Sequence, residues 1–376
     1  MIGKPFVGRW RRFRWFTMMD THELPALDGV RGLAIILVIF YHSAALIRWK
    51  GPQGSLAVST FGFSGVLLFF VLSGFLLFLP YARALVVGHP WPSAKRFYRR
   101  RVRRILPVYL SVLASMAVLL AGSGNLTATR GVSLGLAALL MHNLSTNATT
   151  LIAQINGALW TLAIEWQFYL VLPWIALAFR RWPRPALGAL IIGGLALRVL
   201  DAAVRAHGIA VSMTAPGPVG VLFRLCYGYY GRYLEVFALG MGLSLLYVVW
   251  HPSRRLALWI SGLALAAFGG GFPACSVWAM AFLLQPGVPR DWTWFVFGVW
   301  ITGLCFALLL LVALLPSLRA AFSFAPLRFV GMLSYSIYAW HGLVFLFVRS
   351  LLPALAVSML VSAVSYYGIE RPFLRR

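Results

Sequence analysis

Long runs of apolar residues constrain the fold of this chain more than any other feature. A helix of about 20 apolar residues is long enough to cross the hydrocarbon core of a bilayer, which is roughly 30 Å thick. Runs of about this length lie at 30–47, 61–79, 105–122, 159–179, 185–204, 230–250, 256–272, 292–315, 328–349 and 351–369. We therefore expect an all-α protein, a polytopic transmembrane bundle of about ten helices.

The composition separates this chain from soluble nucleic-acid binders. Hydrophobic residues make up 61% of the chain and charged residues 11%, whereas about a quarter of the residues in a soluble domain are charged. The formal net charge of +25 would suit nucleic acid, but proteins that bind nucleic acid carry their basic residues on a water-exposed surface. Here the basic residues fall between apolar runs, so we expect membrane lipids, and no nucleic acid, as partners.

The basic residues also predict the orientation of the chain, because Lys and Arg of short loops collect on the cytoplasmic side. The densest basic runs are 9–14, 95–104, 180–184, 254–255 and 371–376. These runs all lie on one side only if the short apolar stretch 131–144 does not cross the membrane. The sequence leaves open whether this stretch spans the membrane, re-enters it or lies at its surface. We expect ten spans and both termini in the cytoplasm.

This orientation divides the chain into three parts. A basic N-terminal segment at 1–26 precedes a transmembrane domain at 27–370, and a basic tail follows at 371–376. We expect the protein to lie in a bacterial inner (plasma) membrane.

Ionisable residues inside apolar runs are few, and such residues usually face a cavity, a partner or a substrate path. They are Arg31, His42, Glu165, Arg198, Arg232, Glu235 and His341. The three cysteines lack the spacing of metal ligands, so we expect no metal site.

Arg31 and His42 are eleven positions apart, which returns them to nearly the same face of one helix, about 16 Å apart along its axis. In the expected orientation Arg31 lies at the cytoplasmic end and His42 past the middle of the bilayer. Arginine binds phosphate or carboxylate, and histidine moves a proton near neutral pH. The alternative is an arginine that reaches to the membrane surface and a histidine that hydrogen-bonds a neighbouring helix.

Glu165 lies about a turn and a half into its apolar run, at a depth similar to that of His42. Its carboxylate could orient a histidine, accept a substrate hydroxyl or form a structural ion pair with Arg232. Ser334, Tyr338 and His341 share one helix face at i, i+4 and i+7, which indicates either a polar seam between helices or a second part of a site.

A cluster of arginines at 99–104 directly precedes the third apolar run. It could bind the phosphates of a nucleotide-bearing donor, because guanidinium groups pair well with phosphate. A role in orientation and lipid binding is the alternative.

Together these motifs resemble the acyltransferase-3 family of membrane-bound acyltransferases, and the resemblance covers most of the chain. Members move acyl groups, often acetyl, from a cytoplasmic donor such as acetyl-CoA to hydroxyls of carbohydrates or related molecules. The residues that carry the resemblance are 27–34 with His42, 69–75, the arginine cluster, 160–169, 334–338 with His341, and 370–372. The resemblance implies an O-acyltransferase with acyl-CoA, expected to be acetyl-CoA, as co-substrate and no permanently bound cofactor.

The resemblance also implies roles for individual residues. The family's arginine, ten intervening residues and histidine fall on Arg31 and His42. Its paired arginines, two residues apart, fit either Arg100 with Arg103 or Arg101 with Arg104, and the sequence does not decide between these registers.

As a hypothesis, the arginines hold the donor and His42 acts as the general base. Glu165 would then orient His42 or bind the acceptor, and Ser334, Tyr338 and His341 form a candidate acceptor site or second site.

The main alternative function is a transporter or flippase, in which Arg, Glu and His inside the membrane line a substrate or proton path. The sequence shows no inverted repeat, which disfavours this alternative. A catalytically idle membrane partner is a third reading, against which the joint presence of Arg31, His42 and Glu165 argues.

The sequence does not identify the carbohydrate or lipid-linked acceptor, the acyl group or the oligomeric state. Some family members carry an additional C-terminal extracytoplasmic domain that completes the transfer. Since the chain ends at Arg376, we expect its membrane domain or a separate partner to engage the acceptor.

Overall fold

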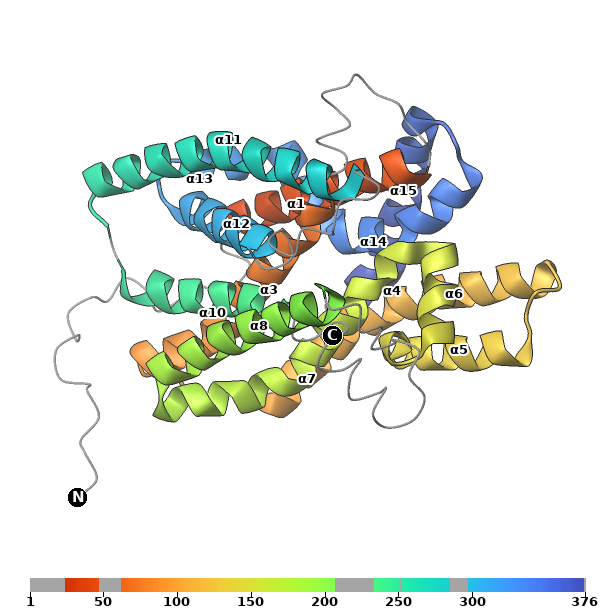
Figure 1. Cartoon of the computed structure of the whole chain (residues 1–376), viewed down its shortest axis with the longest axis horizontal. Helices are drawn as coiled ribbons and strands as arrows, with labels where there is room; N and C mark the ends of the chain where they lie inside the picture. The colour runs from red at the N-terminus through yellow and green to blue at the C-terminus, as the bar shows by residue number, and fades with distance from the viewer. Residues whose placement is uncertain (1–23, 47–61, 207–232, 251, 285–296, 375–376) are drawn as a thin grey trace.

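The computed structural model describes residues 24–46, 62–206, 233–250, 252–284 and 297–374. All regular structure within these ranges is helical, as Figure 1 shows. The expected all-α bundle is therefore confirmed.

Each predicted apolar run corresponds to a helix. The long helices are α1 (Pro25–Leu46), α3 (Gly65–Val86), α4 (Ala94–Gly122), α7 (Trp160–Arg181), α8 (Pro183–Ala206), α10 (Leu234–Val249), α11 (Arg254–Leu284), α12 (Val299–Leu314), α14 (Ala325–Phe347) and α15 (Leu351–Ser365). By length and composition, seven helical stretches of the described chain can cross a membrane, and α10 and α12 are shorter apolar helices. The number of spans and the sides of the termini remain predictions.

The stretch 131–144 does not form a continuous helix. It contains the end of α5 (Ala128–Ala138), then Leu140 with a positive φ of 57°, then the 3₁₀ turn η3 (His142–Leu144). The helix α6 (Thr146–Asn156) follows and packs back against α5, which gives the hairpin at one side of the bundle in Figure 1. With 11 residues α5 is about 16 Å long, too short to cross the bilayer core.

Glycines let α3 and α10 pack backbone against backbone. A Cβ atom at Gly74 of α3 would overlap the carbonyl of Phe237, and one at Gly240 of α10 would overlap the carbonyl of Val71. Small residues of this kind allow close approach between helices in membranes, where burial from water no longer drives association. The crossing fixes the middle of α3, which lines the site described below.

The helices α1 and α14 make a second close crossing and run in the same direction. Near their N-terminal ends a Cβ atom at Gly331 would overlap the carbonyl of Asp28. Farther along, the rings of His42 and His341 lie 4.8 Å apart between centroids. This crossing brings residues about 300 positions apart to one side of the bundle.

The helices α3 and α10 also run in the same direction, since Phe70 contacts Tyr233 and Phe75 contacts Tyr247. In a series of alternating spans, the first and ninth run parallel, and so do the second and sixth. The predicted series of ten has this property, whereas a series in which 131–144 also crosses does not. The packing therefore fits a series of spans in which 131–144 does not cross, and the side of each terminus stays a prediction.

Two of the ionisable residues predicted inside the membrane pair with each other. Arg198 of α8 donates from Nε to the carboxylate of Glu235 on α10 over 3.0 Å, and both side chains are buried. Arg232, which was also predicted to lie inside the membrane, is outside the described residues. Arg198 and Glu235 join two helices, which is the structural role open to such a pair.

Candidate active site

A cavity of about 170 Å³ lies among α1, α3, α4, α7 and α14. Its polar lining residues come from all five helices and are Arg31, Ser73, Arg101, Arg104, Thr161, Glu165, Tyr169, Ser334, Tyr335 and Tyr338. Many of the residues singled out in the sequence thus meet in one place, although they are distant in the chain.

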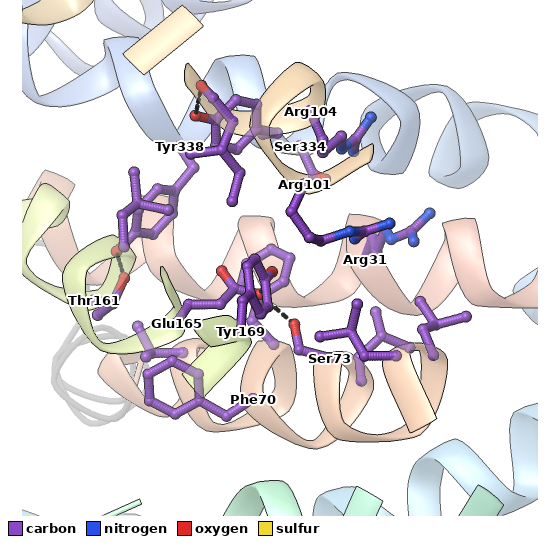
Figure 2. Close-up of a pocket in the computed structure, with 18 residues that line it drawn as sticks. Arg31, Phe70, Ser73, Arg101, Arg104, Thr161, Glu165, Tyr169, Ser334 and Tyr338 are labelled. Atoms are coloured by element: carbon purple, nitrogen blue, oxygen red, sulfur yellow. Dashed lines mark hydrogen bonds between the residues drawn. The ribbon is translucent and has the colours of Figure 1, made fainter. Parts of the chain in front are cut away.

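The cavity has two chemically different ends. Figure 2 shows the side chains of Arg31, Arg101 and Arg104 gathered at one end, with Thr161 and Tyr338 at the other. The side chains of Ser73, Glu165 and Tyr169 lie between them.

Carboxylates neutralise only part of the positive charge at the arginine end of the cavity. Arg31 pairs with Asp28 over 2.7 Å between Nη1 and Oδ1, and Arg104 pairs with Glu370 over 2.6 Å between Nη1 and Oε1. Arg101 forms no ion pair with a described residue; its guanidinium lies 5.9 Å from the ring centroids of Phe97 and Tyr169. This end of the cavity is therefore suited to an anionic group.

The two arginine registers that the sequence left open differ in their position relative to the cavity. Arg101 and Arg104 line the cavity, because residues three apart share a face of a helix. Arg100 is exposed and Arg103 is half-buried, and neither lines the cavity.

Glu165 occupies the centre of the cavity and accepts hydrogen bonds from two hydroxyls. Ser73 of α3 and Tyr169, one turn farther along α7, both donate to Oε1 of this carboxylate. The sequence left three roles open for Glu165: to orient a histidine, to accept a substrate hydroxyl or to pair with Arg232, which lies outside the described residues. Among the described residues, the hydrogen bonds to Glu165 come from Ser73, across the contact of α3 with α7, and from Tyr169 of α7 itself.

At the far end, Thr161 and Tyr338 share a hydrogen bond, and the Tyr338 hydroxyl also donates to the carbonyl of Ala158. Ser334 lines the cavity one turn before Tyr338, as their shared helix face predicts. The third residue of that face, His341, does not line it.

The two predicted histidines, His42 and His341, contact each other, and His341 also contacts Tyr338. The ring of His341 lies 4.8 Å from that of His42 and 6.0 Å from that of Tyr338, between centroids. Each histidine donates from Nδ1 to the carbonyl four residues earlier, over 3.0 Å to Val38 and 2.9 Å to Ile337. In a neutral ring this leaves Nε2 unprotonated and able to accept a proton.

The helix face shared by Arg31 and His42 therefore does not bring both residues into one cavity. Arg31 lines it, whereas His42 does not and lies against His341 of α14.

Several residues of the site were not assigned a role from the sequence. Ser73 and Tyr169 belong to motifs that carried the family resemblance, but an uncharged hydroxyl in an apolar run gives little signal of its own. Glu370 is fully buried in a π-helical turn, η8 (Tyr366–Glu370), where it also accepts a hydrogen bond from Ser336 over 2.8 Å. It holds Arg104 at the arginine end of the cavity.

Comparison with known proteins agrees with the family resemblance that the motifs indicated. The model of the acyltransferase-3 family, described as an acyltransferase domain, matches residues 24–369. The peptidoglycan O-acetyltransferase OatA of Listeria monocytogenes is 30% identical over 346 residues, which cover 86% of this chain and 50% of that protein.

Two further relatives are each 26% identical. They are the O-acetyltransferase OatA of Staphylococcus aureus, with 96% of this chain and 58% of that protein covered, and the putative membrane-bound transacylase BcsY of Komagataeibacter xylinus, with 98% and 87% covered. No solved structure matches.

The chain spans about half the length of the OatA proteins that it matches. The family match nevertheless extends over nearly all of this chain, from the start of α1 to the π-helical turn that holds Glu370. The chain thus belongs to the acyltransferase-3 family and is an integral membrane protein.

Proposed function

We propose that this protein transfers an acetyl group from cytoplasmic acetyl-CoA to a hydroxyl of a cell-envelope carbohydrate, within a bacterial inner membrane. The observation that carries the proposal is the cavity itself, in which three guanidinium groups at one end adjoin a carboxylate bound to hydroxyls.

The arginine end supplies what an acyl-CoA donor requires. Coenzyme A carries several phosphate charges, and guanidinium groups form strong charge-assisted hydrogen bonds with phosphate oxygens. Arg31, Arg101 and Arg104 hold the phosphates or the adjoining part of the donor, and the thioester extends toward Glu165. In the predicted orientation this end faces the cytoplasm, where acyl-CoA is found.

The histidine pair supplies the base for the acceptor. His42 takes the proton of the acceptor hydroxyl at Nε2, because Nδ1 is already engaged with the Val38 carbonyl. General base catalysis of this kind contributes about 10²- to 10⁴-fold in rate. Tyr338 lines the cavity and its ring contacts that of His341, which in turn contacts His42, so the acceptor approaches on the Tyr338 side of the cavity.

The names of the relatives bear on the class of acceptor. One is a peptidoglycan O-acetyltransferase and another a putative transacylase. We therefore propose a carbohydrate polymer of the cell envelope, or its lipid-linked precursor, as the acceptor.

The proposal is tested with purified protein in detergent, radiolabelled acetyl-CoA and extracted cell-envelope fractions. The original protein should hydrolyse the thioester slowly and transfer label to one fraction. His42→Ala should lose transfer by about 10²-fold or more, because the general base is removed. His89→Ala, which changes an exposed histidine between α3 and α4, is the matched control and should keep full activity.

Two results would contradict the proposal. Normal transfer by His42→Ala would exclude His42 as the base. Failure of the original protein to use acetyl-CoA, together with uptake of an unmodified solute in vesicles, would favour a transporter, which leaves its substrate chemically unchanged.

A further inference from the structure

Ser73 is placed as an activated nucleophile would be. It lies on α3 in the wall of the cavity, and its hydroxyl donates a hydrogen bond to the carboxylate of Glu165. A serine hydroxyl is a weak nucleophile until an adjacent base can take its proton. Glu165 is such a base, within direct contact of Ser73.

A third group orients the base. Tyr169 donates to the same carboxylate oxygen as Ser73, so the position of Glu165 is fixed from two sides. Nucleophile, base and an orienting partner together form the usual arrangement of covalent catalysis. The backbone beside Ser73 is also fixed, because the next residue, Gly74, packs directly on the α10 backbone.

The other aliphatic hydroxyls in the cavity wall have different surroundings. Thr161 is bound to Tyr338, and no described carboxylate accepts a hydrogen bond from either Thr161 or Ser334. Among the described aliphatic hydroxyls that line the cavity, Ser73 is therefore the one that is bound to a potential base.

The two ends of the site give a reason for an intermediate. The arginines suited to the donor lie at one end. Tyr338 lies at the other end, and its ring contacts His341 of the histidine pair. Ser73 lies between these ends, as Figure 2 shows. A group held there can be received from the donor side and released to the acceptor side in two separate steps.

We propose that Ser73 carries the acyl group as a covalent ester between donor and acceptor, which rests on the proposed acyl-CoA-dependent function. In the first step Oγ of Ser73 bonds to the acyl carbon, the carbon–sulfur bond of the thioester breaks, and the serine proton passes to Glu165. Coenzyme A leaves as a thiolate next to the arginines and takes up a proton from water.

In the second step the acceptor oxygen bonds to the acyl carbon and the bond from that carbon to Oγ of Ser73 breaks. Glu165 returns its proton to Ser73, and His42 takes the proton of the acceptor hydroxyl. His42 then releases this proton to water, which replaces the proton that coenzyme A took up. The products are the acylated acceptor and free coenzyme A, and the protein returns to its starting state.

The test traps the intermediate in the absence of acceptor. Purified protein is mixed with acetyl-CoA labelled in the acetyl group, quenched in acid, and measured for protein-bound label by intact-mass spectrometry and peptide mapping. The original protein should gain one acetyl group on the peptide that contains Ser73. Ser73→Ala should lose this label and at least 10²-fold in transfer rate, and Glu165→Gln should lose the label because its amide cannot take the proton.

Two further variants keep the test decisive. Ser73→Cys should form a thioester in place of an ester, so its label should be released by neutral hydroxylamine while that of the original protein resists. This change in lability cannot come from a purely structural role for Ser73. Ser244→Ala, which removes another buried hydroxyl that is bound only to the carbonyl of Met241, is the matched control and should keep the label.

The outcomes separate this inference from the proposed function. Transfer by Ser73→Ala at the original rate, or label that maps to another residue, would overturn the serine intermediate and leave the acyl-CoA-dependent activity intact. No use of acetyl-CoA by the original protein would overturn both.

Discussion

At the scale of single residues, one position along α4 separates an arginine that lines the cavity from one that does not. Arg101→Ala should raise the KM for acetyl-CoA by about tenfold or more, because a charge-assisted hydrogen bond contributes about 1.5–3 kcal/mol. Arg100→Ala removes the same charge from the exposed neighbouring position and should change KM little. Initial rates at varied acetyl-CoA concentration measure both, and equal effects would contradict the assignment of Arg101 to the donor.

His142 predicts a pH dependence that is separate from catalysis. It lies in the turn between α5 and α6, it is buried, and neither ring nitrogen has a partner among the described residues. Burial lowers the pKa of His142 to about 4, because the charged ring is poorly solvated. In the unfolded chain this histidine has a pKa of about 6.5. Between about pH 6.5 and pH 4 the unfolded chain therefore binds the proton more readily than the folded protein does.

The stability supplied by neutral His142 is therefore present above about pH 6.5 and is lost as the pH falls toward 4. The loss reaches about 3 kcal/mol at pH 4, because each pKa unit corresponds to about 1.4 kcal/mol. His142→Gln should flatten this part of the profile relative to the original protein, since the two proteins differ at this residue alone. Thermal unfolding in detergent between pH 7 and pH 5 measures the difference, and parallel profiles would contradict the prediction.

Sequence reasoning found the charged residues of the site more readily than its hydroxyls. Arg31 and Glu165 are visible because a charge in an apolar run is costly and calls for an explanation. Ser73 carries no such cost, and its contact with Glu165 joins positions 92 residues apart. The helix face of His42 was predicted, but the His341 ring beside it depends on how α14 crosses α1.

At the scale of helices, the contact between α3 and α10 gives a prediction about stability. Gly240→Ala places a methyl group against the backbone of Val71, so the two helices must move apart. Overpacking of this kind costs about 1–3 kcal/mol. The apparent melting temperature in detergent should fall, and acetyl transfer should fall with it, because the wall of the cavity shifts.

Gly262→Ala on α11 is the matched control. A Cβ atom there has no atom within 4 Å, and alanine favours a helix over glycine by about 1 kcal/mol. Its melting temperature should stay the same or rise. An equal fall in both variants would show that the loss at Gly240 does not come from the helix crossing.

The positions of most helices were predictable because each apolar run is long and continuous. The hairpin of α5 and α6 was not, since a run of about 14 apolar residues suits a buried or re-entrant segment as well as an interfacial one. The reversal depends on Leu140 and on a reciprocal pair of amide hydrogen bonds, each 2.9 Å long, between Asn143 and Gln167. Neither the backbone conformation of Leu140 nor this pair of hydrogen bonds can be recognised from the hydropathy of the sequence.

At the scale of the whole molecule, the predicted orientation can be measured directly. A single cysteine is introduced at Asn125, between α4 and α5, or at His89, between α3 and α4, after Cys226, Cys275 and Cys305 are replaced by serine. In intact spheroplasts a membrane-impermeant maleimide should label Asn125→Cys, and it should label His89→Cys only after the membrane is opened. The reverse pattern would invert the orientation and place the arginine end outside.

The class of the fold followed from composition, whereas the pairing of helices did not. Lipid-facing and protein-facing surfaces are equally apolar, so the hydrophobic pattern does not show which helices touch. The parallel crossings of α1 with α14 and of α3 with α10 depend on glycines whose importance is visible only in three dimensions. These crossings create the cavity.

The separation of charge along the cavity has an energetic consequence. Moving one elementary charge through a membrane potential of 100 mV costs about 2.3 kcal/mol. If the donor binds as proposed, with its phosphates at Arg31, Arg101 and Arg104, the group that passes toward the histidines is an uncharged acetyl group. On the proposed mechanism the acetyl group crosses the bilayer without doing electrical work, so its passage needs no coupling to an ion gradient.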